Sequence, residues 1–358
     1  MSKTEKSEPT LADALNEGRG GRLDNGYQGA ITAVSDAIGE AERFVFSYDA
    51  LDACQHLAES KPSSLLEATK FCRVPFERVW IEWSRRPHLL GQKDPNGNSF
   101  PKKQGVLIEC LDDSFKRFGI TLIWIHQNDA QNSIIKNYVA GENIIQICPV
   151  SFIVNWHDKW PVLDPLYNIS GVDNLNKADI KFCNKMKRYE NGDVERRAAR
   201  DLLVNRVPSV CPYMDGYLRT VENKIGGNNK KIMREAAMND WAGEYEIIIA
   251  MLCLLNSKNC VEKSKIDMAA INKSRKKAGK RELIGHSKVT INLSKSEANC
   301  CNYKNMSVAD VRQHIVRGHF KIRNGGVFWW RPFLRGNASI GVVKRTGYSV
   351  VNKTQNAF

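Results

Sequence analysis

Histidines, basic side chains and aromatic rings are interleaved in one stretch near the C-terminus, residues 314–336. The chain reads His-Ile-Val-Arg-Gly-His-Phe-Lys-Ile-Arg over 314–323, and Val-Phe-Trp-Trp-Arg-Pro-Phe-Leu-Arg-Gly over 327–336. Lysine and arginine can neutralise phosphates, and indole rings can stack on unpaired bases for about 1–3 kcal/mol each. This combination of residue types is typical of a nucleic-acid-binding surface.

The two halves of this stretch are expected to form a β-hairpin, because Asn324-Gly325 between two strand-like runs is a strong hairpin signal. Successive side chains point to opposite faces of a strand. The first strand therefore carries a basic row on one face, made of Arg317, His319, Lys321 and Arg323. His314 would lie on the opposite face.

The length of the hairpin loop decides which residues of the second strand join the basic row. A two-residue loop would set Phe328 and Trp330 beside Lys321 and His319. A three-residue loop would instead bring the set Trp329, Arg331 and Arg335 to that side. Because a slip of one residue exchanges the two faces, both registers stay open.

The same stretch could carry chemistry. His319 could act as a general acid or base and Arg317 could stabilise a developing negative charge, as RNA cleavage requires. An endoribonuclease-like enzyme is therefore one alternative to simple binding, and a virion or assembly protein facing packaged DNA is another. Phosphate binding is the favoured interpretation of His319, because no carboxylate accompanies it.

The distribution of charge supports a local anion-binding region. The chain has 358 residues and a net charge of +14. Residues 258–353 hold 21 Lys and Arg against 5 Asp and Glu, whereas the remainder holds 32 against 34. Charge asymmetry of this kind indicates contact with nucleic acid or an acidic surface. Within residues 258–353, we expect a basic helix over 264–278 that Gly279 ends. The residues of this helix and the segment after it that we expect to contact phosphates are Lys276, Lys277, Lys280 and Arg281.

The elements that must position these residues indicate an α+β fold. Helical spacing recurs over 28–70, and Val194–Val207 reads as a helix that Pro208 ends. Residues 79–83 fit either a strand or a short helix. Apolar runs of strand length, which favour an antiparallel sheet, lie at 105–110, 120–125, 143–148 and 151–154. Residues 244–255 are apolar around the whole helix and predict a buried helix.

Four regions follow from these patterns. They are a flexible N-terminus (1–28), an α+β N-terminal domain (29–170), a helical region with the basic helix (171–282) and a basic, mostly β C-terminal module (283–358). We expect helical segments to pack on the antiparallel sheet.

Other kinds of site find little support. Cys300, Cys301, His314 and His319 lack the spacing of a zinc finger, and no phosphate-binding glycine loop is present, so we expect no metal and no cofactor. Three glutamates, Glu77, Glu82 and Glu109, are expected at the surface. The scattered cysteines and the polar N-terminus predict buried thiols and a cytoplasmic protein without a membrane anchor.

Several elements together resemble a group of uncharacterised proteins of tailed phages and prophages. The resemblance rests on the basic segment 271–283, the element Arg317-Gly318-His319, the run Pro332-Phe-Leu-Arg-Gly336, and residues 341–350. Residues 74–82 are similar to the N-terminal half of those proteins. One departure is Gln313, where many of them have a basic residue. The resemblance implies a viral origin and the host cytoplasm, and it implies no reaction.

Overall fold

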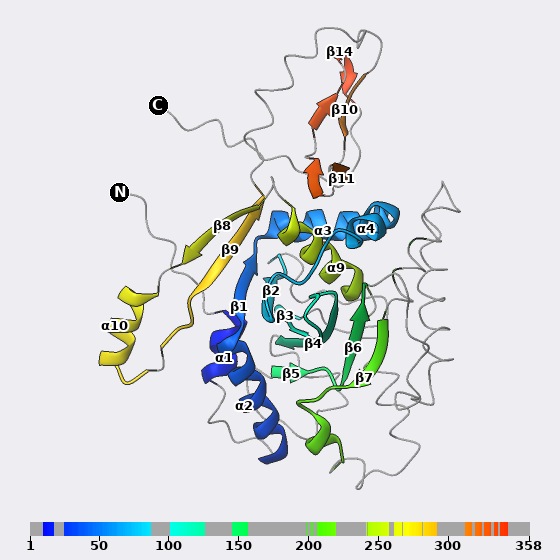
Figure 1. Ribbon diagram of the computed structural model, residues 1–358. Coiled ribbons are helices and arrows are strands. Elements are labelled where there is room, and N and C mark those ends of the chain that lie inside the picture. The colour runs from blue at the N-terminus through cyan, green and yellow to red at the C-terminus, as the bar shows by residue number, and fades with distance from the viewer. Residues whose placement is uncertain are drawn as a thin grey trace.

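The computed structural model describes most of the predicted elements (Figure 1). The described residues are 10–17, 25–86, 101–125, 145–156, 198, 202, 206–219, 241, 243–257, 261–266, 268–280, 282–291, 312–316, 319–323, 326–330, 333–335 and 337–342. The statements below concern these residues.

A nine-stranded sheet forms the centre of the molecule, in the order β7-β6-β4-β3-β2-β1-β9-β8, with β5 paired to β4. The strands are β1 (Glu42–Phe46), β2 (Arg78–Ser84), β3 (Lys103–Cys110), β4 (Arg117–Ile125), β5 (Ile145–Ile147), β6 (Val150–Asn155), β7 (Arg206–Val210), β8 (Val261–Ile266) and β9 (His286–Ile291). Strand β1 runs parallel to β2 and to β9, and the other pairs are antiparallel. The α+β class is confirmed, and the sheet is mixed rather than wholly antiparallel.

Helices cover both faces of the sheet because both faces of its strands are apolar. On one face, α1 (Leu11–Glu17) and α2 (Asn25–Glu40) share a buried cluster with Trp80, Leu107 and Ile123. On the other face, α3 (Tyr48–Ser60), α4 (Pro62–Thr69) and α9 (Glu244–Asn256) pack against Ile81, Ile108 and neighbouring residues. Alternate residues of β2 and β3 therefore serve two different cores.

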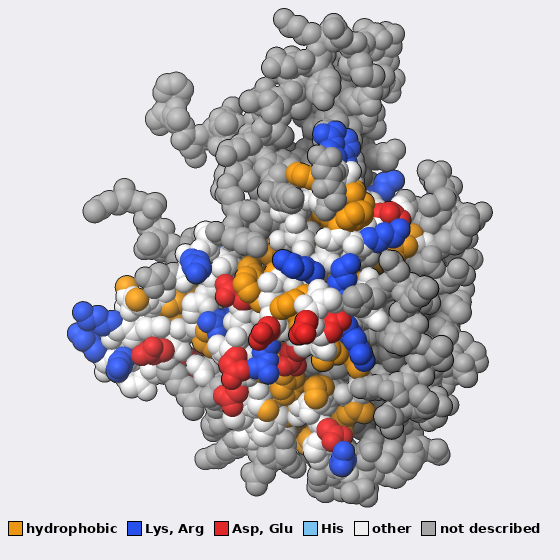
Figure 2. Space-filling model, viewed as in Figure 1, with side chains coloured by type: hydrophobic (Ala, Val, Ile, Leu, Met, Phe, Trp, Pro, Cys, Tyr) orange, Lys and Arg blue, Asp and Glu red, His pale blue; other side chains and the backbone are white. Residues whose placement is uncertain are grey.

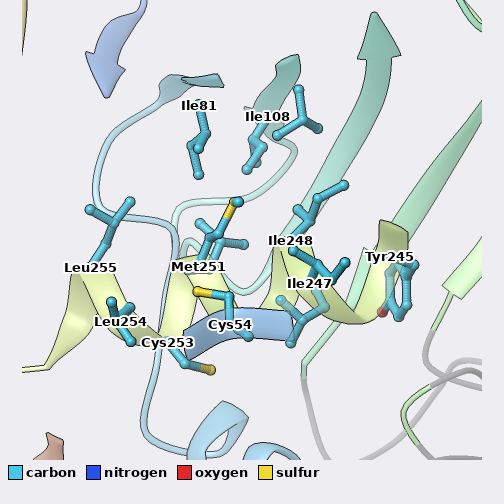
Figure 3. Packing of buried hydrophobic residues seen from close by; sticks show 14 of the residues in the cluster. Cys54, Ile81, Ile108, Tyr245, Ile247, Ile248, Met251, Cys253, Leu254 and Leu255 are labelled. Atoms are coloured by element: carbon cyan, nitrogen blue, oxygen red, sulfur yellow. The ribbon is translucent and has the colours of Figure 1, made fainter. Parts of the chain in front are cut away.

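Helix α9 lies at the centre of the second core, as its uniformly apolar sequence predicts. All residues from Glu244 to Leu255 are buried. Figure 3 shows its side chains beside Ile81, Ile108 and Cys54 of the surrounding elements. The indole Nε1 of Trp241, just before the helix, donates a hydrogen bond to the carbonyl of Val150 at 2.9 Å and ties this end to β6.

The helix predictions for two segments before residue 211 are wrong. Strand β1 lies inside the segment for which helices alone were expected. The helix expected to run to Val207 gives way to β7, in which Pro208 pairs with Phe152 of β6. Because β7 is the last strand on its side of the sheet, the missing amide hydrogen of Pro208 can be tolerated there.

The beginning of the basic region belongs to the central sheet. The segment expected to be one helix over 264–278 forms β8 and then a shorter helix, α10 (Ala269–Lys277). Strand β9 continues the sheet by pairing with β1, with Phe44 opposite Ser287 and Phe46 opposite Val289. The position chosen for the start of the C-terminal module, residue 283, thus lies between α10 and a strand of the large sheet.

Candidate nucleic-acid interface

Residues 312–342 form two small β structures. The hairpin pairs β11 (His319–Arg323) with β12 (Gly326–Trp330). A three-stranded sheet pairs β10 (Arg312–Val316) with β13 (Phe333–Arg335) and β14 (Asn337–Val342). The first expected strand therefore contributes β10 to the three-stranded sheet and β11 to the hairpin, and the second contributes β12 to the hairpin and β13 to the three-stranded sheet.

The register of the hairpin is the one expected for a two-residue loop. His319 pairs with Trp330, Lys321 with Phe328, and Arg323 with Gly326. Lys321 and Phe328 are half-buried, and Arg323 is exposed. On this face, the basic positions of β11 therefore lie opposite positions of β12, two of which, Phe328 and Trp330, are aromatic.

The opposite face of the hairpin is apolar and rests on the body of the molecule. Phe320, Val327 and Trp329 belong to the same buried cluster as α9. The rings of Phe320 and Trp329 meet edge to face, with centroids 5.3 Å apart. Ser64 of α4 donates a hydrogen bond from Oγ to the carbonyl of Phe320 at 3.4 Å. These contacts direct the basic face away from α4 and α9.

This packing removes Trp329 from the expected stacking surface. Its side chain is 2% exposed, so neither face of the indole is open to a nucleic-acid base. The physical reason is the register: the two-residue loop pairs Trp329 with Phe320 on the apolar side. Phe328, which pairs with Lys321 and is half-buried, is an aromatic side chain on the basic side, and Trp330 pairs with His319 in the backbone register.

The other hairpin candidates are divided between regions. Arg335 pairs with His314 in the three-stranded sheet, and so it does not extend the basic row of the hairpin. Arg317 and Arg331, together with Arg281 near α10, lie outside the described residues. The juxtaposition of His319 and Arg317 that the endoribonuclease alternative requires therefore stays a prediction.

Helix α10 carries the second group of expected contacts. Figure 2 shows basic side chains gathered at the end of the molecule where Figure 1 places this helix. Lys276, Lys277 and Lys280 are exposed, as is Lys273, and none of the four makes an ion pair with a residue that the structure describes. None of the residues of α10 is buried. Among the residues that the structure describes, these four lysines therefore present positive charge to solvent without an ionic partner.

Gly279 ends α10 as the sequence predicts. It adopts a left-handed φ of 66°, which is unfavourable for residues with a Cβ atom. The amide of Lys280 donates to the carbonyl of Arg275 at 3.0 Å, and that of Gly279 donates to Lys276 at 3.1 Å. This pair of bonds is a Schellman motif, which stops the helix and leads the chain back towards the sheet.

The helix and the hairpin form two separate basic surfaces. In Figure 1, α10 lies beyond one end of β8 and β9, and the hairpin lies near the other end. Lys265 and Lys288 are exposed on the strands between them. A strand of nucleic acid that follows β8 and β9 from one surface to the other would therefore pass both of these lysines.

Buried charges outside these surfaces were not anticipated by the sequence. Arg85 donates to Glu244 at 2.9 Å, and both side chains are largely buried at the start of α9. Burial raises the pKa of Glu244, and the charge of Arg85 opposes that rise. The guanidinium of Arg206 lies between the rings of Phe152 and Tyr245, 4.4 and 4.6 Å from their centroids. This enclosed arrangement stabilises the core rather than presenting charge to a ligand.

Neither a metal-binding cluster nor a membrane-spanning helix is found among the described residues. Within the described ranges, no three His, Cys, Asp or Glu side chains are grouped so that they could hold a metal ion. Among the helices that the structure describes, none has the length and apolar character needed to cross a bilayer.

Five of the six described cysteines are buried, as predicted, and the sixth, Cys110, is half-buried.

Comparison with known proteins adds no relationship to these observations. No family model, no curated protein and no solved structure matches this chain.

Proposed function

We propose that this protein binds nucleic acid by contacting phosphates with two basic surfaces. The observation that carries the proposal is the array of exposed lysines on α10, which have no ionic partner in the described part of the chain. The hairpin face of Lys321 and Arg323 is the second surface, where Trp330 can add base stacking. A body that is nearly neutral in charge fits a localised contact better than general adhesion.

The resemblance of 271–283, 317–319, 332–336 and 341–350 to phage and prophage proteins supports a viral setting for this binding. The proposed partner is accordingly phage or host nucleic acid in the host cytoplasm. The exposed lysines described above support the binding of nucleic acid, and cleavage through His319 and Arg317 stays the alternative.

The test is a salt titration of the full chain with labelled single- and double-stranded DNA and RNA. Counterion release predicts that the logarithm of the affinity falls linearly with the logarithm of salt concentration. Replacing Lys276, Lys277 and Lys280 by glutamine should weaken binding and reduce the slope by at least about 0.7–0.9, the change expected when one phosphate contact is lost.

The matched control removes three exposed cations from the body, with Lys61→Gln, Lys70→Gln and Arg117→Gln. This variant should keep the affinity of the natural chain. Absence of salt-dependent binding to all four nucleic acids, or equal losses in the two triple variants, would contradict the proposal.

A further inference from the structure

An open groove runs between α10 and the segment that returns to β9. Its volume is about 560 Å³, which lies within the range of small-molecule sites. Four apolar side chains, Ile266, Met268, Ala269 and Leu283, line it. Lys273 and Lys276, one turn apart on α10, contribute two positive charges, and Glu282 contributes one negative charge.

The groove is held in place by hydrogen bonds from both sides. The side chain of Asn272 donates to the carbonyl of Leu283 at 2.8 Å and accepts from its amide at 2.7 Å. From the opposite side, Asp13 of α1 accepts from the amide of Ile284 at 3.0 Å. Glu17, also of α1, forms an ion pair with Arg275 of α10. The two walls are therefore positioned before any ligand arrives, which reduces the entropic cost of binding.

The charges in the groove remain available to a ligand. Lys273, Lys276 and Glu282 are exposed, and none has an ionic partner among the described residues, although they line one groove. A ligand that fits this lining must combine an anion for the lysines, a hydrogen-bond donor for the carboxylate and a flat or apolar part for the remaining wall.

A nucleotide with an unpaired base meets these three requirements. Its phosphate can contact the lysines, and the edge of its base carries the hydrogen-bond donors that a carboxylate can accept. Within a duplex the base is stacked and paired, so the apolar wall would gain nothing, and Glu282 would face the phosphate backbone.

Building on the proposed nucleic-acid binding, we infer that this groove holds one nucleotide of a single-stranded nucleic acid. Lys273 and Lys276 hold the phosphate, and Glu282 selects against the duplex. Lys277 and Lys280, which do not line the groove, add general attraction only.

The experiment compares two double variants of equal charge in the full chain. Lys273→Gln with Lys276→Gln removes the groove lysines, and Lys277→Gln with Lys280→Gln removes two lysines of the same segment outside the groove. Fluorescence anisotropy with a labelled single-stranded 20-mer and with the matching duplex measures affinity. Circular dichroism and thermal unfolding confirm that each variant is folded.

The groove pair should reduce the salt slope for the single strand by about 0.7, because the contact with one phosphate is lost, and the other pair should reduce it less. Glu282→Gln should raise the affinity for the duplex and so reduce the ratio of the single-strand affinity to the duplex affinity. Equal effects of the two lysine pairs, or an unchanged preference in Glu282→Gln, would overturn the groove while leaving nucleic-acid binding intact. Absence of binding by the natural chain would instead overturn the proposed function itself.

Discussion

At the scale of single residues, Gly105 of β3 shows how closely the first core is packed. A Cβ atom at this position would lie 2.3 Å from two ring carbons of Trp80, and 3.1 Å from a methyl of Leu11. Trp80 is completely buried and cannot move aside without displacing its neighbours. The absence of a side chain at Gly105 is therefore what admits the indole ring.

We expect Gly105→Ala to destabilise the protein by about 1–3 kcal/mol or more through overpacking. Urea unfolding measures this change. Gly119→Ala on the neighbouring strand β4 is the control, because a methyl group added there has no other atom within 4 Å. Equal stabilities of the two variants would contradict the proposed steric conflict.

A second residue-scale feature is Glu82, which was expected at the surface and is buried. Its carboxylate accepts hydrogen bonds from the amides of Leu11 and Ala12 at 3.0 and 3.1 Å, and from Nε1 of Trp80 at 2.8 Å. Burial raises the pKa of Glu82, and these hydrogen bonds reduce but do not cancel the rise. The side chain joins α1 to the sheet, which explains why a charge occupies the core.

This raised pKa predicts how stability depends on pH. The folded protein holds the proton of Glu82 more tightly than the unfolded chain does, because glutamates in an unfolded chain have a pKa of about 4.3. The contribution of Glu82 is therefore complete below that pH and is lost as pH rises through the folded-state pKa.

The variant Glu82→Gln does not titrate, so its deficit in unfolding free energy relative to the natural chain should shrink as pH rises. Urea unfolding of both proteins at a series of pH values measures this difference. Glu67→Gln, at an exposed surface pair with Lys70, is the control. A deficit that is independent of pH would show that Glu82 keeps its ordinary pKa in the folded protein.

At the scale of elements, α10 depends on tethers rather than on a buried face. None of its residues is buried, and Asn272 supplies two side-chain hydrogen bonds to Leu283. Isolated helices of this length are marginal in water, so the tethers must contribute to its order.

We expect Asn272→Ala to increase the rate of hydrogen exchange of the α10 amides by about tenfold or more, because two hydrogen bonds of roughly 1 kcal/mol each are lost. Hydrogen exchange read by mass spectrometry checks this, with β3 as the internal reference. Ser274→Ala, an exposed position on the same helix, should leave exchange unchanged. Unaltered protection in Asn272→Ala would show that other contacts hold the helix.

At the scale of the whole molecule, the basic C-terminal part is not an appendage. Strand β9 covers the edge of β1, and the hairpin covers α4 and α9 with Phe320, Val327 and Trp329. A chain ending at residue 257 would expose that edge and that apolar surface together, and both favour association between chains.

We therefore expect residues 1–257 to aggregate, whereas a chain ending at residue 342 keeps every described strand and should behave like the full chain. Light scattering after size-exclusion chromatography distinguishes the two outcomes. A monodisperse 1–257 chain with cooperative thermal unfolding would show that the central sheet is stable without its C-terminal strands.

The sequence predicted correctly those elements that depend on interactions between residues close together in the chain. Local signals identified the strands around 105–110 and 120–125, the buried helix at 244–255 and the helix end at Gly279. The α+β class followed from these elements. By contrast, β1 was missed because its five residues lie between helices, and its partners β2 and β9 are far away in sequence.

The sequence by itself determined which residue types are concentrated near the C-terminus and that they alternate on strands. Only the tertiary structure decided their faces: the register of Phe320 against Trp329 buries that tryptophan and leaves the Lys321 side outward. The same is true of Glu82 and of the groove beside α10, which arise where distant segments meet. The physical reason is that a one-residue change of register exchanges the faces of a strand, and packing against helices chooses between registers that are locally equivalent.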